Sequence, residues 1–574
     1  MSTLRPAFLL CAFLTCAFSA SLAHAAAPRP TSARDAMVVT AHPLATEAGL
    51  EMLARGGNAV DAAVAAAFAL GVAEPYGSGL GGGGFALVHL AESGATLAID
   101  FRETAPAAAG PDFYLDDNGD VISEASLKGH RAVAVPGQVA GLAFLAERYG
   151  RLSLRTLVDP ALQTANVGVP VDEVMHAKLT SLRDHLAAHP ETRRIFLNPD
   201  GSVPGLGSLL PQPDQAAALY WIGQYGAPAF YDGPIADALI AEMERGAGAV
   251  TRADLARYNV TVREPVSGTY RGGTVMAMPP PSSGGVHLIQ MLNMLEGDDL
   301  GAMGFGSAEL IHLMAEVERR AYADRAEYLG DPAFSDVPVA ELTSKDYARH
   351  LRAQIDPERA TPSSEVHPGL AAYSPAEGDN TTHLCVIDED GNAVSMTSSI
   401  NSSFGSGVTV PGFGILLNNT MDDFAAKPGV PNLYGLVGSE ANAIAAGKIP
   451  LSSMTPTMVF GHNGELIGVM GSPGGSRIIT TVLQIVVNLA DHHMDVSAAV
   501  AAPRFHHQWL PDEIKMERGG FSPDTIRILE GMGHTVVQEP AWSNATAIID
   551  DARQSHPLSG AADPRGNGTA GAAP

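Results

Sequence analysis

The chain has 574 residues, of which 46% are hydrophobic and 17% are charged, so it is long enough and apolar enough to bury a large core. Its formal net charge is −27 and its isoelectric point is near 5.0. An acidic surface repels phosphate backbones, so this charge argues against nucleic-acid partners and against a polybasic membrane-surface role.

The N-terminus has the pattern of an export signal. Arg5 provides a short positive region, residues 6–22 form an apolar stretch, and residues 23–25 (AHA) provide a small-x-small cleavage site. A transmembrane anchor is the competing interpretation, and the short apolar stretch disfavours it. We therefore expect a signal peptide over residues 1–25 and a periplasmic or secreted protein that keeps no membrane anchor.

Two helices follow an expected first strand at residues 38–40. Residues 46–54 have the pattern of an amphipathic helix that ends at Gly56-Gly57, a common C-terminal stop. Asn58 has the side chain to cap a second helix, which extends to Ala73.

A glycine-rich run at residues 77–84 matches the G-x-G-x-x-G pattern. The dinucleotide fingerprint must follow a strand and open a helix. This run instead follows a helix and opens an expected strand at residues 85–90, so we expect the glycines to allow close backbone approach in a packed sheet. A further strand at residues 95–101 ends at Arg102. The guanidinium of Arg102 is either a surface ion-pair partner or a clamp for a carboxylate, which it can hold with two parallel bonds.

The central part of the chain, residues 135–350, is mainly helical in pattern, with examples at residues 139–148, 234–245 and 308–328. Residues 351–380 are polar and rich in proline, which indicates a linker.

Beyond this linker, residues 382–387 and 393–400 read as two strands around an Asp-Gly turn, which is a strong hairpin signal. Cys385 lies in the first of these strands, where burial is expected rather than thiol chemistry. Because Cys11 and Cys16 lie in the expected signal peptide, the mature chain has no partner for an intrachain disulfide.

Thr381 lies at the mouth of this hairpin. A hydroxyl is a weak nucleophile unless a base removes its proton. A free α-amino group has a pKa of roughly 7.7–8.0, so a threonine made N-terminal by cleavage after Asn380 would carry its own base. On this stretch alone, the start of an ordinary strand is the simpler interpretation, because threonine is common in strands.

A second hairpin is expected over residues 457–460 and 466–470, and a glycine-rich turn then leads into a helix at residues 476–489. Backbone N–H groups at such a turn form an anion site, or an oxyanion hole if a nucleophile faces it. Before this hairpin, residues 427–438 are rich in proline and glycine and contain Tyr434, a composition typical of a loop that covers a site.

Several motifs occur in order along nearly the whole chain after residue 35: DFRE (100–103), DNTTH (379–383), LNN (417–419) with MDDF (421–424), PLSSM (450–454) and GSPGGSR (471–477). Together they resemble the gamma-glutamyltranspeptidases (glutathione hydrolases), a family of N-terminal-nucleophile hydrolases. The resemblance implies an α+β fold, a four-layer αββα sandwich, whereas the sequence pattern alone indicates only a mixed α/β protein.

The same resemblance implies autocatalytic cleavage between Asn380 and Thr381. The products would be a large subunit of residues 26–380 and a small subunit of residues 381–574, which together form a heterodimer and one joint fold. The last residues, about 566–574, are rich in glycine and alanine and are expected to form a disordered tail.

The chemistry implied by the resemblance is γ-glutamyl hydrolysis and transfer, with glutathione as the expected donor and water, an amino acid or a peptide as the acceptor. Thr381 would attack the carbonyl of Asn380 during processing and the γ-amide of the substrate during turnover, with its freed amine as the general base. Ser399, at the position of a family threonine, would hydrogen-bond the nucleophile. The N–H groups of Gly474 and Gly475 would stabilise the oxyanion.

Recognition of a glutamyl group requires partners for both of its α-charges, because an unpaired buried charge is costly. The resemblance implies Arg102, Ser452 and Ser453 for the α-carboxylate, and Asn401 and Asp423 for the α-ammonium.

Two further substrate-binding residues are expected, Tyr434 in the lid and Thr420. Family members commonly have Gln or Glu at the position of Thr420, and the shorter, uncharged threonine predicts weaker ammonium recognition or a bridging water. A glutaryl-type acylase, as among the cephalosporin acylases of similar fold, is therefore the alternative, although Asp423 disfavours it because a glutaryl group has no ammonium. An inactive, exported γ-glutamyl-binding protein is the alternative of another class, and the intact Thr381 disfavours it.

No cofactor is expected. The histidine pairs at residues 492–493 and 506–507 lack a partnered glutamate or cysteine at helix-face spacing, so we expect no metal site there.

Overall fold

The structure is a computed structural model that describes residues 28–368, 381–427, 439–550 and 557–573. The expected signal peptide, Asn380, Tyr434 and the expected lid apart from Lys427 lie outside the described residues.

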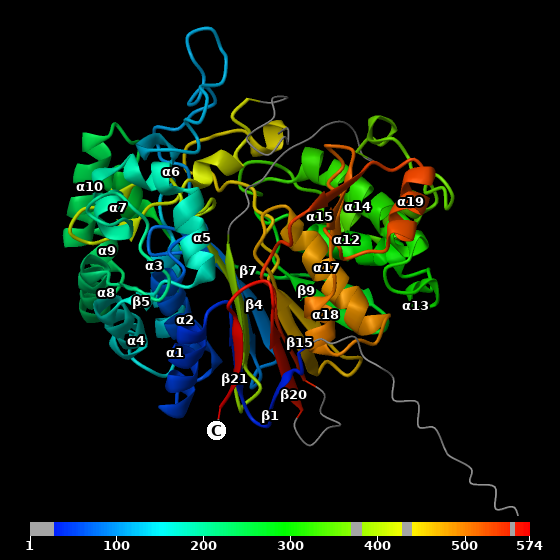
Figure 1. Cartoon of the computed structure of the whole chain (residues 1–574), viewed down its shortest axis with the longest axis horizontal. Coiled ribbons are helices and arrows are strands. Elements are labelled where there is room, and N and C mark those ends of the chain that lie inside the picture. Colours follow the sequence, from blue (N-terminus) through cyan, green and yellow to red (C-terminus); the bar gives the residue numbers. More distant parts are fainter. Residues whose placement is uncertain (1–27, 369–380, 428–438, 551–556, 574) are drawn as a thin grey trace, which may run out of the picture.

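Two seven-stranded antiparallel sheets form the centre of the molecule (Figure 1). The first sheet has the order β21 (Thr569–Ala572), β2 (Met37–Thr40), β10 (Thr382–Ile387), β11 (Ala393–Ser399), β3 (Gly83–Leu90), β4 (Ala95–Asp100), β7 (Thr261–Arg263). The second sheet has the order β1 (Thr31–Ala33), β20 (Leu558–Ala562), β19 (Thr546–Asp550), β15 (Leu466–Gly471), β14 (Thr457–Phe460), β9 (Gly273–Ala277), β8 (Val266–Tyr270). Short strands elsewhere are β5 (Val169–Pro170), β6 (Leu209–Leu210), β12 (Thr409–Val410), β13 (Ile415–Leu416), β16 (Phe505–His506), β17 (Ile514–Glu517) and β18 (Val536–Glu539).

Side chains of the first sheet alternate between two cores, because successive residues of a strand point to opposite faces. Val39 and Phe85 belong to the core that also contains Val469 of the second sheet. Val38 and Ala86, one residue away, belong to the core that the first sheet shares with helices. Both faces of this sheet are therefore buried at its inner strands β2, β10, β11 and β3, which are rich in apolar residues.

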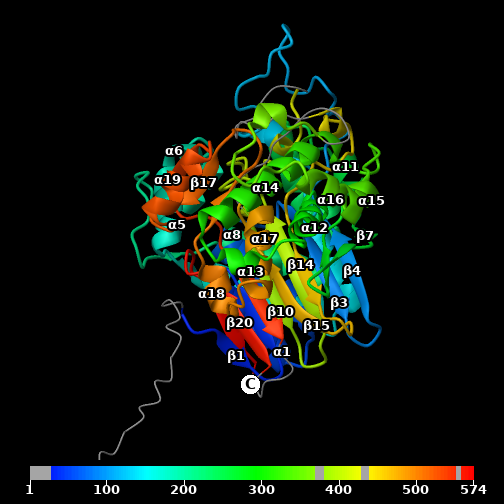
Figure 2. The same ribbon diagram turned by 90° about the vertical axis from the view of Figure 1, so that its right-hand side faces the viewer.

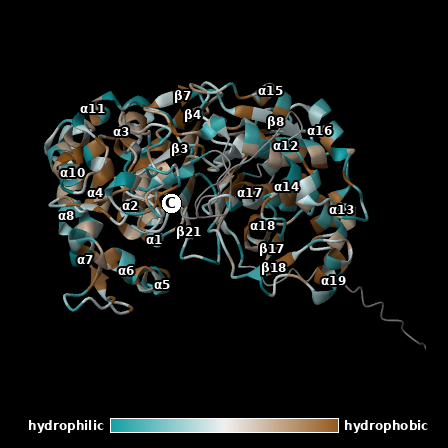
Figure 3. Cartoon of the chain, turned by 90° about the horizontal axis from the view of Figure 1, so that it is seen from above, coloured by the Kyte–Doolittle hydropathy of each residue, from teal (hydrophilic) through white to brown (hydrophobic). Residues whose placement is uncertain are grey.

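Helices cover the outer face of each sheet and complete the four-layer αββα sandwich (Figures 1 and 3). The first group is α1 (Pro43–Ala54), α2 (Ala59–Ala73), α3 (Gln138–Tyr149), α4 (Leu154–Val167), α5 (Glu173–Ser181), α6 (Arg183–Ala187), α7 (Pro190–Phe196), α8 (Pro213–Tyr225), α9 (Pro228–Tyr231), α10 (Pro234–Arg245) and α11 (Arg252–Arg257). The second group is α12 (Gly284–Leu295), α13 (Leu300–Met303), α14 (Ala308–Tyr328), α15 (Val339–Leu342), α16 (Lys345–Arg352), α17 (Arg477–Ala490), α18 (Val496–Ala501) and α19 (Pro523–Gly531). Within the second group α17 packs on β15 (Figure 2). Single 3₁₀ turns are η1 (His130–Ala132), η2 (Ser363–Glu365), η3 (Thr420–Asp423) and η4 (Glu440–Asn442).

Local signals in the sequence correctly placed the elements that lead to the expected nucleophile. Asn58 caps α2 and forms a reciprocal capping box with Asp61. The strands β10 and β11 form the expected hairpin, and Thr382 lies opposite Ser398. Cys385 is completely buried in β10, as expected, and burial raises the pKa of its thiol to about 12.

The hairpin of β10 and β11 lies between β2 and β3, which precede it by hundreds of residues. Both sheets therefore contain strands from before and after the expected cleavage point. Fragments cut at that point would be held together by complete strand pairs.

The glycine run after α2 allows the close backbone approach expected from its sequence. A Cβ added at Gly82 would lie 2.0 Å from the carbonyl oxygen of Ser399, and one at Gly84 would lie 2.3 Å from that of Thr397. Any side chain here would push away the strand that ends at Ser399.

One expectation from the sequence is wrong. The C-terminal residues do not form a disordered tail, since Thr569–Ala572 form β21 at the edge of the first sheet, where Ala572 pairs with Met37. A Cβ at Gly571 would lie 2.6 Å from Leu50 Cδ1, so the small residues that weakened the strand signal are what let β21 pack against α1. Residues 135–350 are mainly helical, as expected, and the short strands β7, β8 and β9 lie among these helices. No helix among the described residues has the length and apolar character needed to cross a bilayer.

Candidate active site

Thr381 is the residue immediately before β10, and it lies beside the end of β11. Its Oγ1 is 3.4 Å from the Oγ of Ser399, within reach of a hydrogen bond in which either hydroxyl can donate. The Ser399 Oγ also accepts the N–H of Asn401 at 2.8 Å. Asn401 has a φ of 72°, a left-handed conformation that turns the chain sharply after β11. The hydroxyl of Ser399 is thus fixed by backbone, as a group that orients a nucleophile must be.

The residue after Thr381 is fixed by a buried carboxyl group. Thr382 Oγ1 donates to Glu74 at 2.8 Å, and Tyr76 Oη donates to the same carboxyl at 3.0 Å. Burial raises the pKa of Glu74, although His42 and these hydroxyl groups oppose the shift. A Cβ added at Gly77 would lie 3.6 Å from the carbonyl oxygen of Thr381. The backbone of Thr381 is therefore supported from the α2 side.

The turn at Gly474 and Gly475 lies near Thr381. Their φ values are 131° and 58°, which side chains rarely adopt, so glycine is required at both positions. Within the part of the chain that the structure describes, neither N–H takes part in a hydrogen bond. Gly474 and Thr381 line the same cavity. Two free N–H groups in this position are available to an oxyanion.

A buried ion pair joins Arg102, which follows β4, to Asp423 in η3. The guanidinium Nη2 donates to Asp423 Oδ2, and the side chains are only 3% and 5% exposed. Nε donates to the carbonyl oxygen of Pro450 at 3.1 Å. The bonds to backbone and carboxylate fix the planar guanidinium in one orientation.

Ser452 and Ser453 follow Pro450 and are held by α12 and α14. Ser283 donates both its N–H, at 2.7 Å, and its hydroxyl, at 2.8 Å, to the carbonyl oxygen of Ser452. Arg325 donates from Nη2 to Ser453 Oγ at 3.2 Å and from Nε to Ser283 Oγ at 2.8 Å. Because the Ser453 oxygen accepts from Arg325, its own O–H can point to a ligand.

We call the set Arg102, Asp423, Ser452 and Ser453 the clamp. Sequence reasoning missed two residues that adjoin it, Arg325 and Glu103. An arginine among buried positions of the expected helix at residues 308–328 was the signal that could have revealed Arg325.

Glu103 is completely buried next to Arg102. Its Oε1 accepts the hydroxyl of Thr420 at 2.8 Å, and its Oε2 is 3.9 Å from Arg102 Nη1. Burial raises the pKa of Glu103 to about 7, and the positive charge of Arg102 opposes that shift. The hydroxyl of Thr420 thus contacts Glu103, a second carboxyl group besides Asp423. The sequence around Thr420 gives no sign of this contact.

Asn442 connects the parts of the clamp. Its Nδ2 donates to the carbonyl oxygen of Asp423 at 2.7 Å, and its Oδ1 accepts the N–H of Leu451 at 3.1 Å. The same amide therefore fixes the turn that carries Asp423 and the segment that carries Ser452.

The contacts bring the expected residues into two adjoining groups. Ser399 and Asn401 lie with Thr381, and the clamp forms the second group. Asn401 Nδ2 donates at 3.0 Å to the carbonyl oxygen of Asn419, the residue before Thr420, and so links the groups. Asn380 and Tyr434 lie outside the described residues.

A cavity of about 400 Å³ opens beside Thr381. We call it the charged cavity; its lining includes Glu74, Lys178, Thr381, Gly474, Arg477, Glu539 and Trp542. No clamp residue lines it.

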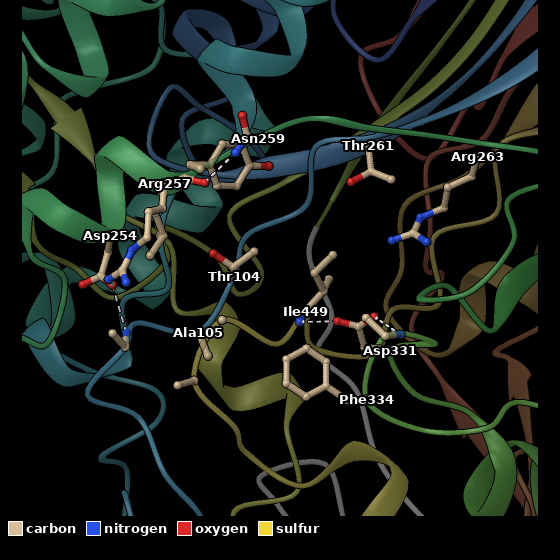
Figure 4. A pocket seen from close by; sticks show the side chains of 16 residues that line it. Thr104, Ala105, Asp254, Arg257, Asn259, Thr261, Arg263, Asp331, Phe334 and Ile449 are labelled. Atoms are coloured by element: carbon tan, nitrogen blue, oxygen red, sulfur yellow. Dashed lines mark hydrogen bonds and ion pairs between the residues drawn. The ribbon is translucent and has the colours of Figure 1, made fainter.

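A separate cavity of about 410 Å³ lies behind the clamp, where Thr104, Asp331 and Ile449 form part of its wall (Figure 4). Asp331 accepts the N–H of Ile449 at 2.9 Å. This bond helps to fix the segment that presents the Pro450 carbonyl to Arg102, so we assign the wall a supporting role.

His312, Glu316 and His534 have ligand atoms within 4.8 Å of one another, the spacing of a possible metal site. The carboxylate of Glu316 is however bound by Arg319 at 3.2 Å and by Arg320 at 2.7 Å. Two guanidinium groups neutralise this carboxylate and repel a cation, so we interpret the cluster as a buried ion-pair network.

Residues 45–573 match the family model described as Gamma-glutamyltranspeptidase. The chain is 47% identical over 536 residues to the glutathione hydrolase proenzyme of Escherichia coli (strain K12), covering 93% of this chain and 91% of that protein. It is 40% identical over 550 residues to the acylase ACY 1 proenzyme of Pseudomonas sp. (strain SE83), covering 94% of each. The crystal structure of cephalosporin acylase from Bacillus halodurans superposes with a TM-score of 0.83 at 28% identity, covering 96% of this chain and 98% of that chain.

Proposed function

Because the chain belongs to the gamma-glutamyltranspeptidase family, we propose that Thr381 is its nucleophile and that the bond between Asn380 and Thr381 is its processing site. The protein is a glutathione hydrolase and gamma-glutamyltransferase, an N-terminal-nucleophile enzyme. Its precursor yields two subunits, and its donor substrate is glutathione.

The observation that carries the assignment of the site is the buried ion pair of Arg102 with Asp423. Asp423 lies in η3, which Asn401 connects to the contact between Thr381 and Ser399. The α-carbon of a γ-glutamyl group carries one negative and one positive group, and a paired cation and anion match both. Arg102, Ser452 and Ser453 bind the α-carboxylate, and Asp423 and Asn401 bind the α-ammonium. A glutaryl group would leave Asp423 without a ligand cation.

Processing and turnover use the same hydroxyl. In processing, Thr381 Oγ1 attacks the carbonyl carbon of Asn380, and the C–N bond breaks so that an ester forms and the Thr381 amine is released. Hydrolysis of this ester separates the two chains and frees the hydroxyl. In turnover, that amine accepts the proton of Oγ1 as it attacks the γ-carbonyl, and then gives the proton to the leaving amine. Water or an acceptor amine then cleaves the γ-glutamyl ester and restores the hydroxyl.

The backbone N–H groups of Gly474 and Gly475 bind the oxyanion in each attack. Loss of one such donor typically costs about 2.7–4 kcal/mol of transition-state stabilisation. Ser399 orients Oγ1, and Thr420 with Glu103 completes the ammonium side.

We further propose that the subunits are residues 26–380 and 381–574, that the acceptor is an amino acid or small peptide when it is not water, and that the signal at residues 1–25 directs the enzyme to the periplasm or the medium.

N-terminal sequencing of the purified, active protein tests the assignment. We expect one chain that starts at Thr381, and we expect Thr381→Ala to remain a single uncleaved chain without turnover. Thr381→Ser is the control, because it keeps a hydroxyl beside the amine and should process slowly. An active protein with no chain beginning at residue 381 would contradict the proposal.

A comparison of γ-glutamyl and glutaryl anilides distinguishes the acylase alternative. We expect the γ-glutamyl anilide to be turned over faster. Equal or faster turnover of the glutaryl anilide would favour the acylase.

A further inference from the structure

The turn before α17 is built from residues that have no side chains to hold it. We call Gly474 and Gly475 the oxyanion turn. Glycine has more backbone freedom than any other residue, so this turn keeps one shape only if its neighbours fix it. The N–H of Arg477 donates to the first carbonyl oxygen of the turn and that of Ile478 to the second, each at 3.1 Å. Ser476 joins the turn to the helix, so contacts to this residue can fix the turn as well.

Ser476 is bound from two directions by residues that are distant in the sequence. Tyr322, in α14, donates its hydroxyl to the Ser476 carbonyl oxygen. The Ser476 hydroxyl donates to Gln508 Oε1 at 2.9 Å. Tyr322 is 4% exposed and Gln508 is 7% exposed, so both bonds lie where water competes little with them. The residue directly after the oxyanion turn is thus held by its backbone and by its side chain.

The amide of Gln508 is oriented by a histidine. His506 Nε2 lies 2.8 Å from Gln508 Oε1, an atom that can only accept, so this nitrogen carries the proton and donates it. His506 Nδ1 lies 2.9 Å from Oγ1 of Thr480 in α17, whose hydroxyl donates to it. Burial lowers the pKa of His506 well below its ordinary value, which keeps the ring in this neutral form. Gln508 Nε2 donates to the Leu510 carbonyl oxygen at 3.2 Å, so the amide presents its oxygen to Ser476 in one orientation.

The segment that carries this histidine is bound by two helices. Glu318 accepts the N–H of His507 at 2.7 Å, and it lies one helical turn before Tyr322 on the same face of α14. Gln484 of α17 donates to the Phe505 carbonyl oxygen at 2.7 Å and accepts the Phe505 N–H at 3.2 Å. The helix α14 precedes the proposed cleavage point and the other parts follow it. Both subunits therefore contribute to the support of the oxyanion turn.

We propose that Tyr322 and Gln508 are positioning residues of the oxyanion turn: by fixing Ser476, they hold the two glycine N–H groups in the orientation that the oxyanion needs. His506 acts through Gln508. This inference rests on the proposed function, because it needs the oxyanion formed when Thr381 attacks the substrate. The oxyanion exists only in the transition states and the tetrahedral intermediates. Loss of either positioning residue should therefore slow the chemical steps and leave substrate binding unchanged.

The first test removes one tyrosine hydroxyl at each end of α17. Tyr322→Phe removes the donor to Ser476 and keeps the ring, which packs edge-on against His506. Tyr270→Phe is the matched control, because Tyr270 is equally buried and donates at 2.7 Å to Asp491, the residue after α17. With a γ-glutamyl anilide and rates expressed per processed chain, Tyr322→Phe should lower kcat about tenfold and leave KM within about twofold. Tyr270→Phe should leave both constants within about twofold, although it should also lower the thermal midpoint.

The second test acts on the other contact of Ser476. Gln508→Met removes the acceptor with little change in volume, and kcat should fall about fivefold with an unchanged KM. Gln508→Glu keeps an oxygen acceptor at the same place and should recover part of this loss. Ser476→Ala removes the same hydrogen bond from its other end. The double variant with Gln508→Met should therefore lose no more than the larger of the two single losses.

The proposal is overturned if Tyr322→Phe lowers kcat no more than Tyr270→Phe does, or if the loss appears in KM. It is equally overturned if Gln508→Glu recovers nothing, or if the losses of Ser476→Ala and Gln508→Met multiply. The variants of Gln508 carry the comparison alone if Tyr322→Phe does not fold. Gly475→Ala tests the proposed function separately, because the φ of 58° at this position disfavours a side chain. A kcat equal to that of the wild type in Gly475→Ala, or a wild type that does not hydrolyse the anilide, would refute the proposed function.

Discussion

The clamp and the charged cavity beside Thr381 each contain an arginine paired with a carboxylate, but the two pairs differ in their exposure to solvent. In the clamp, Arg102 and Asp423 are at most 5% exposed and are paired with each other. In the charged cavity, Arg477 and Glu539 are also paired, but they are 15% and 25% exposed and in contact with open space. The clamp is thus held in one arrangement, as an electrostatically preorganised site requires. The pair in the charged cavity is more exposed, so solvent screens its charges more than those of the clamp.

The largest effect should follow from removing the cation of the clamp. In Arg102→Met, the buried Asp423 loses its partner, and breaking one half of a buried ion pair costs about 3–5 kcal/mol. We expect kcat/KM for a γ-glutamyl anilide to fall by about 10²–10³-fold, together with a lower thermal midpoint. Steady-state kinetics and thermal unfolding measure both quantities.

Arg102→Lys separates the effect on stability from the effect on activity. A lysine keeps the charge but cannot donate to Asp423 and to the Pro450 carbonyl in the same plane. It should restore stability more than activity. Near-wild-type activity of Arg102→Met would show that the pair is structural and that the glutamyl group binds elsewhere.

The difference between the two regions also explains what the sequence could reveal. Features that depend on neighbouring residues were predictable, such as the Asn58 cap, the turn at Asp388 and the hairpin that begins at Thr382. The clamp could be predicted in outline because its residues lie in motifs that resemble those of a known family.

Contacts between distant segments could not be predicted in this way. Glu103 meets Thr420 across 317 positions, and Arg325 meets Ser453 across 128. The charged cavity depends on α5, the turn before α17 and the segment around Trp542, and no motif connects these three. The pairing of β21 with β2 was missed for the same reason, because strand pairing across the whole chain leaves no local signal in four small residues.

A substitution of Arg325 tests whether this residue, which contacts Ser453, contributes to substrate binding. Arg325→Gln removes a positive charge that contacts Ser453 Oγ at 3.2 Å. We expect the KM of a γ-glutamyl anilide to rise about tenfold, with kcat within about twofold, because the α-carboxylate is bound equally in the ground and transition states.

A 4-aminobutyryl anilide, which lacks the α-carboxylate, is the control substrate, and its kcat/KM should not change. A loss of equal size with both anilides would show that Arg325 supports only the fold. Arg325→Lys keeps the charge and should recover part of the affinity.

The smallest effect on substrate binding is expected for Glu103. It should appear as a dependence of stability and of KM on pH. Its pKa is raised from 4.5 to about 7 because it is buried. The folded state therefore binds a proton that the unfolded state has lost, and the stability from this group is complete below pH 4.5 and is lost as pH rises through about 7. The free energy of unfolding of the wild type, relative to Glu103→Gln, should fall between pH 5 and pH 8 by at most about 3 kcal/mol. Denaturant unfolding at the two pH values measures this difference.

The same proton affects binding in the opposite direction. The ionised carboxyl group attracts the α-ammonium of a γ-glutamyl substrate, so the KM of the wild type relative to Glu103→Gln should fall a few-fold as pH rises through 7. A glutaryl anilide has no ammonium and is repelled by the ionised group through its distal carboxylate, so its relative KM should rise instead. If both anilides changed in the same direction, Glu103 would not face the ammonium, and its contact with Thr420 would serve only to satisfy a buried carboxyl group. If the relative KM values of the two anilides changed in opposite directions with pH, Glu103 as well as Asp423 would contribute to the preference for γ-glutamyl over glutaryl groups.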